Sequence, residues 1–355
     1  MDKNSTSDIE QVVGLDVGDR TSQIIVLQLD SGEEVECSRV RTTQRALRSR
    51  FAGVAPLRIA LEVGTHSPWI SRLFSELGHE VIVANARKLR LIYENRNKDD
   101  RVDAEYLARL ARVDPKLLVP VQHSSAQAQA DLALLRARQT LVRTRTRLIL
   151  HCQGVAKSNG FRIPGGSAST FARRLAEGLP ETLQPALAPI LETLILLTRQ
   201  IRDYERQLER LAAERYPETQ LLRQVRGVGV LTALAFVLIV QHPNRFRKSR
   251  DVGAYLGLVP ARRESGQSRP QLGIRKEGNS MLRHLLVQCA HYMMGPFGED
   301  CDLRRFGERL EARGGPGARK RAIVATARRL AVLLHHLWTK GEVYDPLFQQ
   351  HRIAA

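Results

Sequence analysis

The first third of the chain contains short apolar runs in an order that few folds accommodate. Residues 12–18, 22–29 and 34–41 are rich in β-branched or alternating side chains and are joined by connections of a few residues. Connections this short link antiparallel neighbours, so we expect three strands in a meander. Beyond them the periodicity alternates, and it predicts helices at 44–51, 68–77, 88–94 and 100–112 and strands at 57–63 and 81–84.

Three antiparallel strands followed by alternating helices and strands are typical of a ribonuclease H-like fold. In that fold the later strands extend the sheet in parallel, and helices cover its faces. The rest of the chain shows helical rather than extended patterns. The sequence therefore predicts an α/β domain followed by all-α regions: an RNase H-like domain over 1–120, a helical coiled-coil or linker region over 121–217 and a mainly helical domain over 218–355.

Positive charge is concentrated behind the first third. The 355-residue chain has 55 Lys and Arg against 37 Asp and Glu, a formal net charge of +18. Residues 1–120 hold 18 of each sign, whereas residues 121–355 hold 37 basic and 19 acidic residues. This division favours a catalytic role for residues 1–120 and polyanion binding by residues 121–355. Nucleic acid is the favoured polyanion; an anionic membrane surface and a chance scatter of arginine are the alternatives.

Cysteine spacing and hydropathy exclude several protein classes. The four cysteines lie far apart with no C-x-x-C pair, which argues against a zinc ribbon or a disulfide scaffold and fits a reducing cytoplasm. The longest apolar run, residues 231–240, is about ten residues long and too short to cross a bilayer. Residues 1–11 contain no apolar signal core. We therefore expect a cytoplasmic protein with no membrane partner.

Four acidic residues stand out by their positions. Two lie in predicted apolar strands, where a carboxylate is costly to bury, and two share one face of a predicted helix. Asp16 lies in the first predicted strand, and Glu62 ends the fourth. Asp100 and Asp103 are three apart on a predicted helix and so share one of its faces. A carboxylate inside an apolar strand needs a partner or a metal, and carboxylate oxygens suit Mg²⁺ or Mn²⁺. Together the four acids could hold two ions for phosphodiester chemistry.

These acids also have structural interpretations. Asp16 could satisfy a nearby turn, and Asp100 could cap its helix, a role for which Asp99 is nearly equivalent. Glu62 is the hardest to explain in this way, because strand interiors rarely carry an unpaired glutamate. The run 14–18 also resembles the phosphate-binding first strand of actin-like and sugar-kinase ATPases, but no second unit of that kind follows in the basic remainder.

The middle of the chain combines heptad spacing with arginine. Apolar residues recur every seven positions within 126–150, and a 3-4 spacing continues without interruption over 187–211. Two such helices, separated by the Gly- and Pro-containing segment 158–181, could pair with each other or with another subunit. Ordinary core helices of one domain are the alternative. Along the first helix, arginines could follow a nucleic-acid backbone: Arg136, Arg138, Arg143, Arg145 and Arg147.

The last third contains a glycine turn and a polar loop. The turn with Gly227 and Gly229 precedes an apolar helix, as in helix-hairpin-helix modules whose backbone N–H groups bind phosphate; a plain glycine turn is the alternative. Further on, Ser265 precedes Gly266 among basic residues that could bind a phosphate. An ordinary Ser-Gly turn competes with a nucleophilic serine here, and no histidine partner is placed by the sequence.

Taken in order, these motifs resemble those of the DEDD insertion-sequence transposases, also described as bridge-RNA-guided serine recombinases. The resemblance spans nearly the whole chain and rests on segments 14–18, 61–62 and 98–104, on Gly227 and Gly229, and on 256–260, 265–266 and 273–279. It implies an N-terminal domain similar to Holliday-junction resolvases of the RuvC type. It also implies a C-terminal transposase domain that carries a catalytic serine.

The resemblance implies roles for individual residues. Asp16, Glu62, Asp100 and Asp103 would hold Mg²⁺ or Mn²⁺, and Ser265 would form a covalent 5′-phosphoserine link with DNA. A structured non-coding bridge RNA would pair with donor and target DNA. Homodimers would assemble into homotetramers, in which one subunit's acidic domain meets another's serine domain. Nucleic-acid contacts are expected at Arg136, Arg143, Arg147, Gly227, Gly229, Arg262, Arg263 and Lys276.

The chain departs from the family pattern around the serine. The family often shows Ser-Ser-Gly-Gly where this chain has Glu264-Ser265-Gly266-Gln267, so Ser265 is the expected nucleophile and Ser268 the fallback. The segment 158–181 is also less typical. Two other hypotheses remain open: a junction-resolving nuclease that uses the acids alone, and a non-enzymatic DNA-binding protein with a relict acid cluster.

Overall fold

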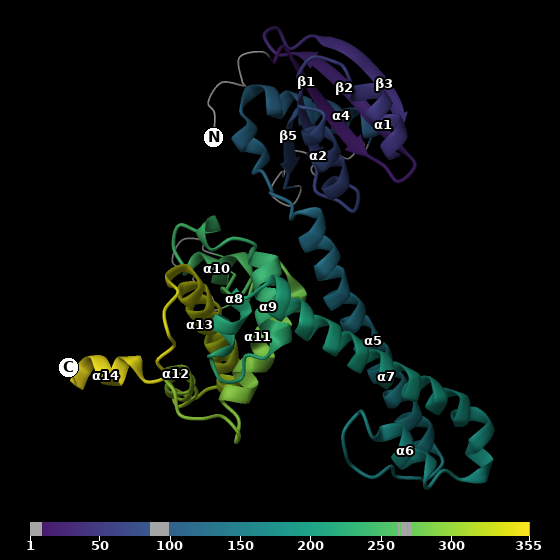
Figure 1. Ribbon diagram of the computed structural model, residues 1–355, viewed down its shortest axis with the longest axis vertical. Coiled ribbons are helices and arrows are strands. Elements are labelled where there is room, and N and C mark those ends of the chain that lie inside the picture. The colour runs from purple at the N-terminus through teal and green to yellow at the C-terminus, as the bar shows by residue number, and fades with distance from the viewer. Residues whose placement is uncertain (1–8, 86–98, 262, 264–267, 269–271, 355) are drawn as a thin grey trace. The chain divides into compact units, whose positions relative to one another are not determined.

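The chain forms two compact units, Met1–Ala126 and Gln127–Ala355. The computed structural model describes residues 9–85, 99–261, 263, 268 and 272–354, and Figure 1 shows the helices and strands of both units. None of the helices in these ranges is long and apolar enough to cross a membrane.

The N-terminal unit is built on a five-stranded mixed sheet in the order β3-β2-β1-β4-β5. β1, β2 and β3 are antiparallel, and β4 and β5 extend β1 in parallel. The strands are β1 Gln11–Val17, β2 Thr21–Gln28, β3 Glu34–Arg41, β4 Arg58–Glu62 and β5 Glu80–Ala84. The mixed α/β class is confirmed, and this sheet is consistent with an RNase H-like domain.

Different helices cover the two faces of this sheet (Figure 1). The helices are α1 Gln44–Phe51, α2 Ser67–Glu76 and α4 Asp100–Val113, followed by a 3-10 turn at Pro115–Leu118. Val13 and Leu15 of β1 belong to the apolar core beneath α1 and α2, whereas Val12 packs with residues of α4. Alternate residues of a strand point to opposite faces, so Gly14 and Asp16 share the α4 face with Val12. The helix expected at 88–94 lies outside the described residues.

Gly14 allows α4 to lie directly on β1. A Cβ at this position would be 1.8 Å from the carbonyl oxygen of Ala104 and 2.7 Å from the amide nitrogen of Ala108. Both are backbone atoms, so the helix would have to move. We expect Gly14→Ala to destabilise the protein by about 1–3 kcal/mol, as overpacking does, with a lower midpoint of thermal unfolding.

A matched glycine variant separates this effect from a general loss of glycine. A Cβ at Gly154, inside a long helix of the second unit, would meet open space. Gly154→Ala should therefore leave the midpoint unchanged or raise it, because alanine favours a helix by about 0.5–1 kcal/mol. Equal midpoints for Gly14→Ala and the wild type would contradict the close packing of α4 on β1.

The second unit is helical in the ranges that the structure describes. Its longest helices are α5, α7 and α13, and 3-10 turns occur at Glu181–Leu183 and Pro243–Arg245. The helices are α5 Ala126–Ser158, α6 Phe171–Ala176, α7 Gln184–Arg215, α8 Glu218–Arg223, α9 Val230–Val240, α10 Asp251–Tyr255, α11 Ser280–Met293, α12 Asp302–Glu311, α13 Ala318–Lys340 and α14 Phe348–Ala354.

α5 and α7 contact each other in antiparallel directions within one chain. Arg215 of α7 donates to both carboxylate oxygens of Asp131 at 2.8 Å, and Arg138 pairs with Glu205. Burial by itself would raise the pKa of Asp131, but hydrogen bonds from Arg215, Tyr216 and Gln127 bring it below its ordinary value. The two helices expected to pair therefore do so within the chain, while a supercoiled or intersubunit coiled coil stays a prediction.

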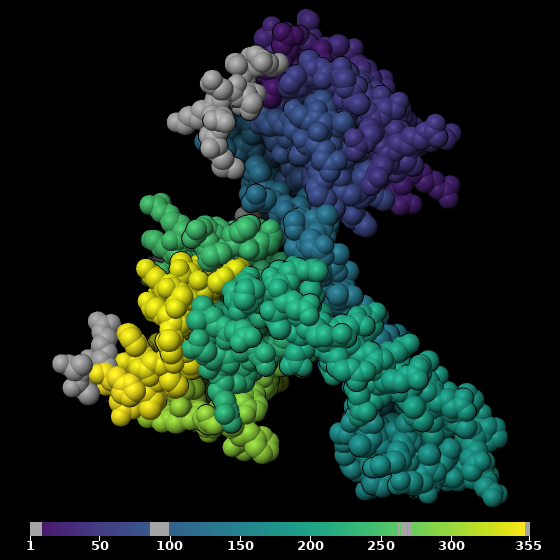
Figure 2. Space-filling model, viewed as in Figure 1, coloured from purple at the N-terminus to yellow at the C-terminus, as the bar shows by residue number. Residues whose placement is uncertain are grey.

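The segment between α5 and α7 closes into a small core of its own. Phe171 and Leu175 of α6 pack with Ile149 and Cys152 of α5 and with apolar residues of α7. Figure 2 shows the side chains of this part forming one packed body at the ends of the two long helices. The segment 158–181, whose role the sequence leaves open, thus covers the apolar ends of α5 and α7.

The C-terminal core surrounds α9. Residues 232–240 are each at most 5% exposed, and α7, α8 and α11 contact this helix. A helix that is apolar all round is stable only when other elements enclose it. The ten-residue apolar run at 231–240 is therefore the centre of a globular core.

His335 of α13 is buried beside a basic connection, the segment 242–250. Its Nε2 lies 2.8 Å from the carbonyl oxygen of Pro243, and its Nδ1 lies 3.0 Å from the Ser249 hydroxyl. Because a carbonyl only accepts, Nε2 carries the proton. Burial lowers the pKa of His335, and the nearby His336 lowers it further, against the raising effect of the Pro243 carbonyl.

This burial makes stability depend on pH. The folded pKa of His335 lies below the unfolded value of about 6.5, so its contribution is complete above about pH 6.5 and is lost as the pH falls through the folded pKa. We expect the thermal midpoint of the wild type to fall more between pH 7.5 and 5.5 than that of His335→Gln, which cannot titrate. Parallel falls in the two proteins would show that His335 does not carry this dependence.

Candidate active site

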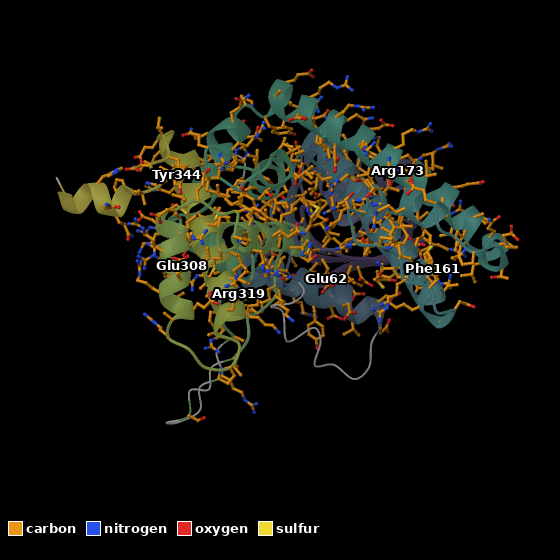
Figure 3. The ribbon with its side chains drawn as sticks, turned by 90° about the horizontal axis from the view of Figure 1, so that it is seen from below. Glu62, Phe161, Arg173, Glu308, Arg319 and Tyr344 are labelled. Atoms are coloured by element: carbon orange, nitrogen blue, oxygen red, sulfur yellow. The ribbon has the colours of Figure 1, made fainter. Side chains whose placement is uncertain are left out.

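Asp16 and Glu62 lie side by side at the carboxyl ends of two parallel strands. β1 and β4 pair in register up to Leu15 and Leu61, so Asp16 and Glu62 are the next pair. Both line a pocket of about 330 Å³, and Oε1 of Glu62 is excluded from solvent. Glu62 is labelled in Figure 3. The structure thus brings these two predicted ligands together.

Asp100 and Asp103 lie in the first turn of α4, which runs antiparallel to β4. Arg58 at the start of β4 donates to the carbonyl oxygen of Ala111 near the end of α4, at 3.4 Å. The first turn of α4 therefore lies toward the other ends of β1 and β4, the ends that carry Asp16 and Glu62. The Asp99 carboxylate accepts from the Arg101 amide at 3.1 Å, so Asp99 rather than Asp100 caps the helix.

The donor set suits a divalent cation. Carboxylate oxygens are the ligands that Mg²⁺ and Mn²⁺ prefer, and a buried carboxylate oxygen beside a second carboxylate is stabilised by a bound cation. In the described ranges, no three His, Cys, Asp or Glu side chains lie close enough to bind one ion together. The residues fit a metal chemically, and convergence of all four acids stays a prediction.

A hydrogen-bonded group that the sequence reasoning missed lies beside these acids. His66 and Ser67, at the start of α2, line the same pocket as Asp16 and Glu62. The Ser67 hydroxyl lies 2.9 Å from Nε2 of His123. Burial lowers the pKa of His123, and the positive charge of Arg72 lowers it further. The sequence offered one signal, a histidine four residues after Glu62 in a polar turn. This signal is weak, because the sequence does not show where the turn lies relative to the acids.

The loop that carries the predicted nucleophile begins and ends on one short antiparallel stem. Pro260 pairs with Ile274, Ala261 donates to the Gly273 carbonyl at 2.9 Å, and Arg275 donates to the Val259 carbonyl at 3.0 Å. Ser265 and Arg262 lie outside the described residues, while Arg263 and Ser268 are described and exposed.

Glycines close the base of this stem. Gly257 and Gly278 have φ of +68° and +80°, and a Cβ on either would meet a backbone oxygen at about 2 Å. The Arg283 guanidinium donates to the Leu256 and Glu277 carbonyls at 2.9 Å, and burial lowers its pKa. Backbone conformation and close packing therefore explain why glycine occurs at positions 257 and 278, on the two sides of the loop. Exposed Lys276, with φ of +57°, lies between them.

The Gly227 and Gly229 turn joins α8 to α9. Gly227 has a φ of +90°, and a Cβ there would lie 2.7 Å from Cδ1 of Tyr292. Gly229 precedes the first turn of α9 and has open space at its Cβ position. Conformation and the contact with Tyr292 thus explain Gly227 without a ligand, and phosphate binding by this turn stays a prediction.

Three of the predicted nucleic-acid contacts share an exposed face of α5. Arg136, Arg143 and Arg147 are exposed and spaced by seven and four residues, which places them on one side of the helix. The α7-facing side carries Arg138 and Arg145 instead. The exposed stripe is sterically available for a polyanion.

Comparisons with known proteins identify two transposase regions along the chain. A model of the transposase IS116/IS110/IS902 family matches residues 219–299, which include Ser265, and a second transposase model, of the DEDD type, matches residues 13–158, which include the four acids. The chain is 30% identical to the transposase for insertion sequence element IS1111A of Coxiella burnetii, with 96% of this chain and 93% of the relative covered.

Further relatives have similar names and coverage. The transposase for insertion sequence element IS1328 of Yersinia enterocolitica is 31% identical, with 80% of this chain and 84% of the relative covered. A probable family 20 transposase of Pseudomonas aeruginosa is 29% identical, with 94% and 98% covered. From this near-full-length similarity and the two family matches, we conclude that the chain belongs to the IS110 family of DEDD insertion-sequence transposases.

Proposed function

We propose that this transposase inserts and excises its element as an RNA-guided recombinase that uses both an acidic metal site and a serine. The observation that carries the proposal is the pairing of Asp16 with Glu62 at the ends of β1 and β4, in one pocket. Two neighbouring carboxylates at the ends of adjacent strands suit a cation that in turn binds phosphate. The serine loop, held on a closed stem in the other unit, supplies a second and different chemistry.

The acidic site would hold the metal through four side chains. Asp16 and Glu62 would bind Mg²⁺ or Mn²⁺ from the sheet, and Asp100 and Asp103 from the first turn of α4. The bound cation would neutralise charge that develops on the attacked phosphate. α4 would bring its two acids into place because Gly14 allows it to lie directly on β1.

The serine would perform the strand exchange. The Oγ of Ser265 would attack the phosphorus and form an O–P bond, while the bond from phosphorus to the 3′ oxygen breaks. The proton lost by the serine would end on the released 3′ hydroxyl. Because one phosphate ester replaces another, attack by a different 3′ hydroxyl would reverse the step and join new partners.

Several nucleic acids would share the positive surface. A structured bridge RNA would pair with donor and target DNA, and its backbone would be neutralised by exposed basic side chains. A homodimer that assembles into a homotetramer would bring the acidic unit of one subunit to the serine unit of another. The assembly would act at the nucleoid in the cytoplasm. The contacts proposed are Arg136, Arg143, Arg147, Gly227, Gly229, Arg262, Arg263 and Lys276.

Purification from cells that carry the DNA flanking the element tests this function. We expect a discrete RNA, encoded by that DNA, to copurify, and a covalent adduct to form on DNA that matches the RNA. The adduct should require Mg²⁺. Protein that is free of RNA and forms no adduct would contradict the proposal.

A junction-resolving nuclease is the second candidate, because the described residues that line the Asp16 and Glu62 pocket all belong to the first unit. Under that function, Ser265→Ala would cut DNA normally and Asp16→Asn would not. A DNA-binding protein without activity would bind in the absence of metal and cut nothing.

A further inference from the structure

The ring of His66 is held in a defined orientation at the mouth of the acidic pocket. The Trp69 indole nitrogen donates to Nδ1 of His66 at 3.1 Å. The two rings are nearly perpendicular, at 87°, with centroids 6.0 Å apart. Both residues come from the first turn of α2 and its cap, so the arrangement is local. His66 also lines the pocket with Asp16 and Glu62.

The indole hydrogen bond determines which ring nitrogen carries the proton. An indole N–H can only donate, so Nδ1 of His66 must accept. A neutral imidazole with an accepting Nδ1 carries its hydrogen on Nε2. Nε2 is therefore a hydrogen-bond donor, and its orientation suits an acceptor rather than a metal ion.

The present partner of this donor is weak. Nε2 lies 3.3 Å from Oδ1 of Asp19, whose side chain is 92% exposed. Exposed pairs of this kind contribute little stability because water competes for both groups. A DNA phosphate that enters the pocket can take the place of Asp19 at Nε2, because the exposed Asp19 side chain loses little by turning to water.

His66 is also free of the capping role that its position suggests. It is the N-cap residue of α2 but makes no side-chain capping hydrogen bond. The turn is closed instead by Ser67, whose hydroxyl accepts from the Gly64 amide at 3.0 Å and donates to the Gly64 carbonyl at 2.9 Å. Ser67 thus makes the hydrogen bonds that close the turn, and the His66 ring lines the pocket instead.

We propose that His66 is a substrate-positioning residue that donates from Nε2–H to a non-bridging oxygen of the DNA phosphate bound at Asp16 and Glu62. This inference rests on the proposed function, since it assumes that the acidic pocket receives a phosphodiester. Asp16 and Glu62 would hold the cation that neutralises the phosphate, and His66 would add a hydrogen bond to the same phosphate. Trp69 acts through His66 by keeping Nδ1 in the accepting state.

Nitrogen NMR on the full chain tests the tautomer and the ligand together. With histidine labelled by ¹⁵N and His66 assigned by its loss in His66→Gln, we expect an unprotonated Nδ1 and a protonated Nε2. Inorganic phosphate, added with Mg²⁺, should shift the Nε2 resonance. Trp69→Phe should allow the other tautomer to appear. An Nδ1-protonated ring in the wild type, or an Nε2 that does not respond to phosphate, would overturn the inference.

Kinetics on DNA that carries the element's ends provides the second measurement. Hydrogen bonds to charged groups contribute enough for His66→Ala to raise the KM for DNA about 10-fold to 100-fold. His66→Gln, which keeps an amide donor, should recover most of this loss. His351→Ala is a matched control, because the His351 ring also lies beside an aspartate, 2.8 Å from Asp345, but in the other unit. This variant should leave the KM for DNA unchanged.

The outcomes separate this inference from the proposed function. If the wild type cuts no DNA but phosphate still shifts Nε2 of His66, the recombinase function fails and the anion-donor role stands. If the wild type forms the covalent adduct and His66→Ala does so with unchanged KM, the His66 inference fails and the recombinase function stands. An equal KM rise in His351→Ala would also overturn the inference.

Discussion

Asp16→Asn is expected to lose DNA cleavage while the protein remains folded. The carboxylate would contribute to binding a cation that supplies several kcal/mol of charge stabilisation, and each 1.36 kcal/mol is tenfold in rate, so we expect a loss of about 1,000-fold. Asparagine has nearly the same shape, so the packing around this side chain is kept. The thermal midpoint should therefore not fall.

Cleavage rates at saturating Mg²⁺ check this prediction. Asp30→Asn is the matched control, because Asp30 is an exposed turn acid just after β2, at the opposite ends of the strands from Asp16. It should cut DNA at the wild-type rate. Full activity in Asp16→Asn would remove the acidic pocket from the mechanism, whatever the serine does.

Ser265→Ala is expected to lose both the covalent adduct and the cleavage. Without the hydroxyl no phosphoserine can form, and removal of a serine nucleophile costs about 10⁶-fold in a well-studied hydrolase, which is below detection here. Binding of DNA and RNA should be unchanged, because the substitution removes one atom from a loop whose stem is closed by other residues.

Ser268→Ala distinguishes the two serines of the loop. Ser268 is exposed and lies three residues further along the chain, so it is a matched control in residue type. We expect this variant to form the adduct at the wild-type rate. Loss of the adduct in Ser268→Ala together with its retention in Ser265→Ala would assign the nucleophile to the fallback residue.

The strands and their order were predictable because strand signals are local. The apolar runs of β1 and β2 lie between short polar turns, and such hairpins are set by residues adjacent in sequence. The alternation on β1 also explains Asp16: it lies on the α4 face, two residues after Gly14. That Gly14 is needed for a helix some ninety residues further on was not predictable, because the contact is long-range.

The acidic site was predictable in part for the same reason. Glu62 was identified as an acid ending a buried strand, and the parallel register with β1 places it beside Asp16. His66 was missed because its importance depends on where a polar turn lies relative to β1. Helix capping by Asp99 could be resolved only with the backbone in view, since Asp99 and Asp100 are equivalent as sequence signals.

In the helical region, too, one feature was predictable from the sequence and another was not. The apolar 3-4 spacing predicted one apolar face along α7, and Leu187, Leu194 and Ile201 on that face are buried. Periodicity gives the face of a helix but not its partner. The antiparallel contact with α5, joined through Asp131 and Arg215, required the three-dimensional arrangement.

Mass spectrometry of the protein–DNA adduct is the most direct test of the central claim. The wild-type protein, purified with its RNA, would be incubated with Mg²⁺ and matching DNA, then digested with nuclease and protease. We predict a single modified peptide with a nucleotide 5′-phosphate on Ser265, absent when Mg²⁺ is removed and absent in Asp16→Asn. Cut DNA with free ends and an unmodified Ser265 peptide would contradict the account.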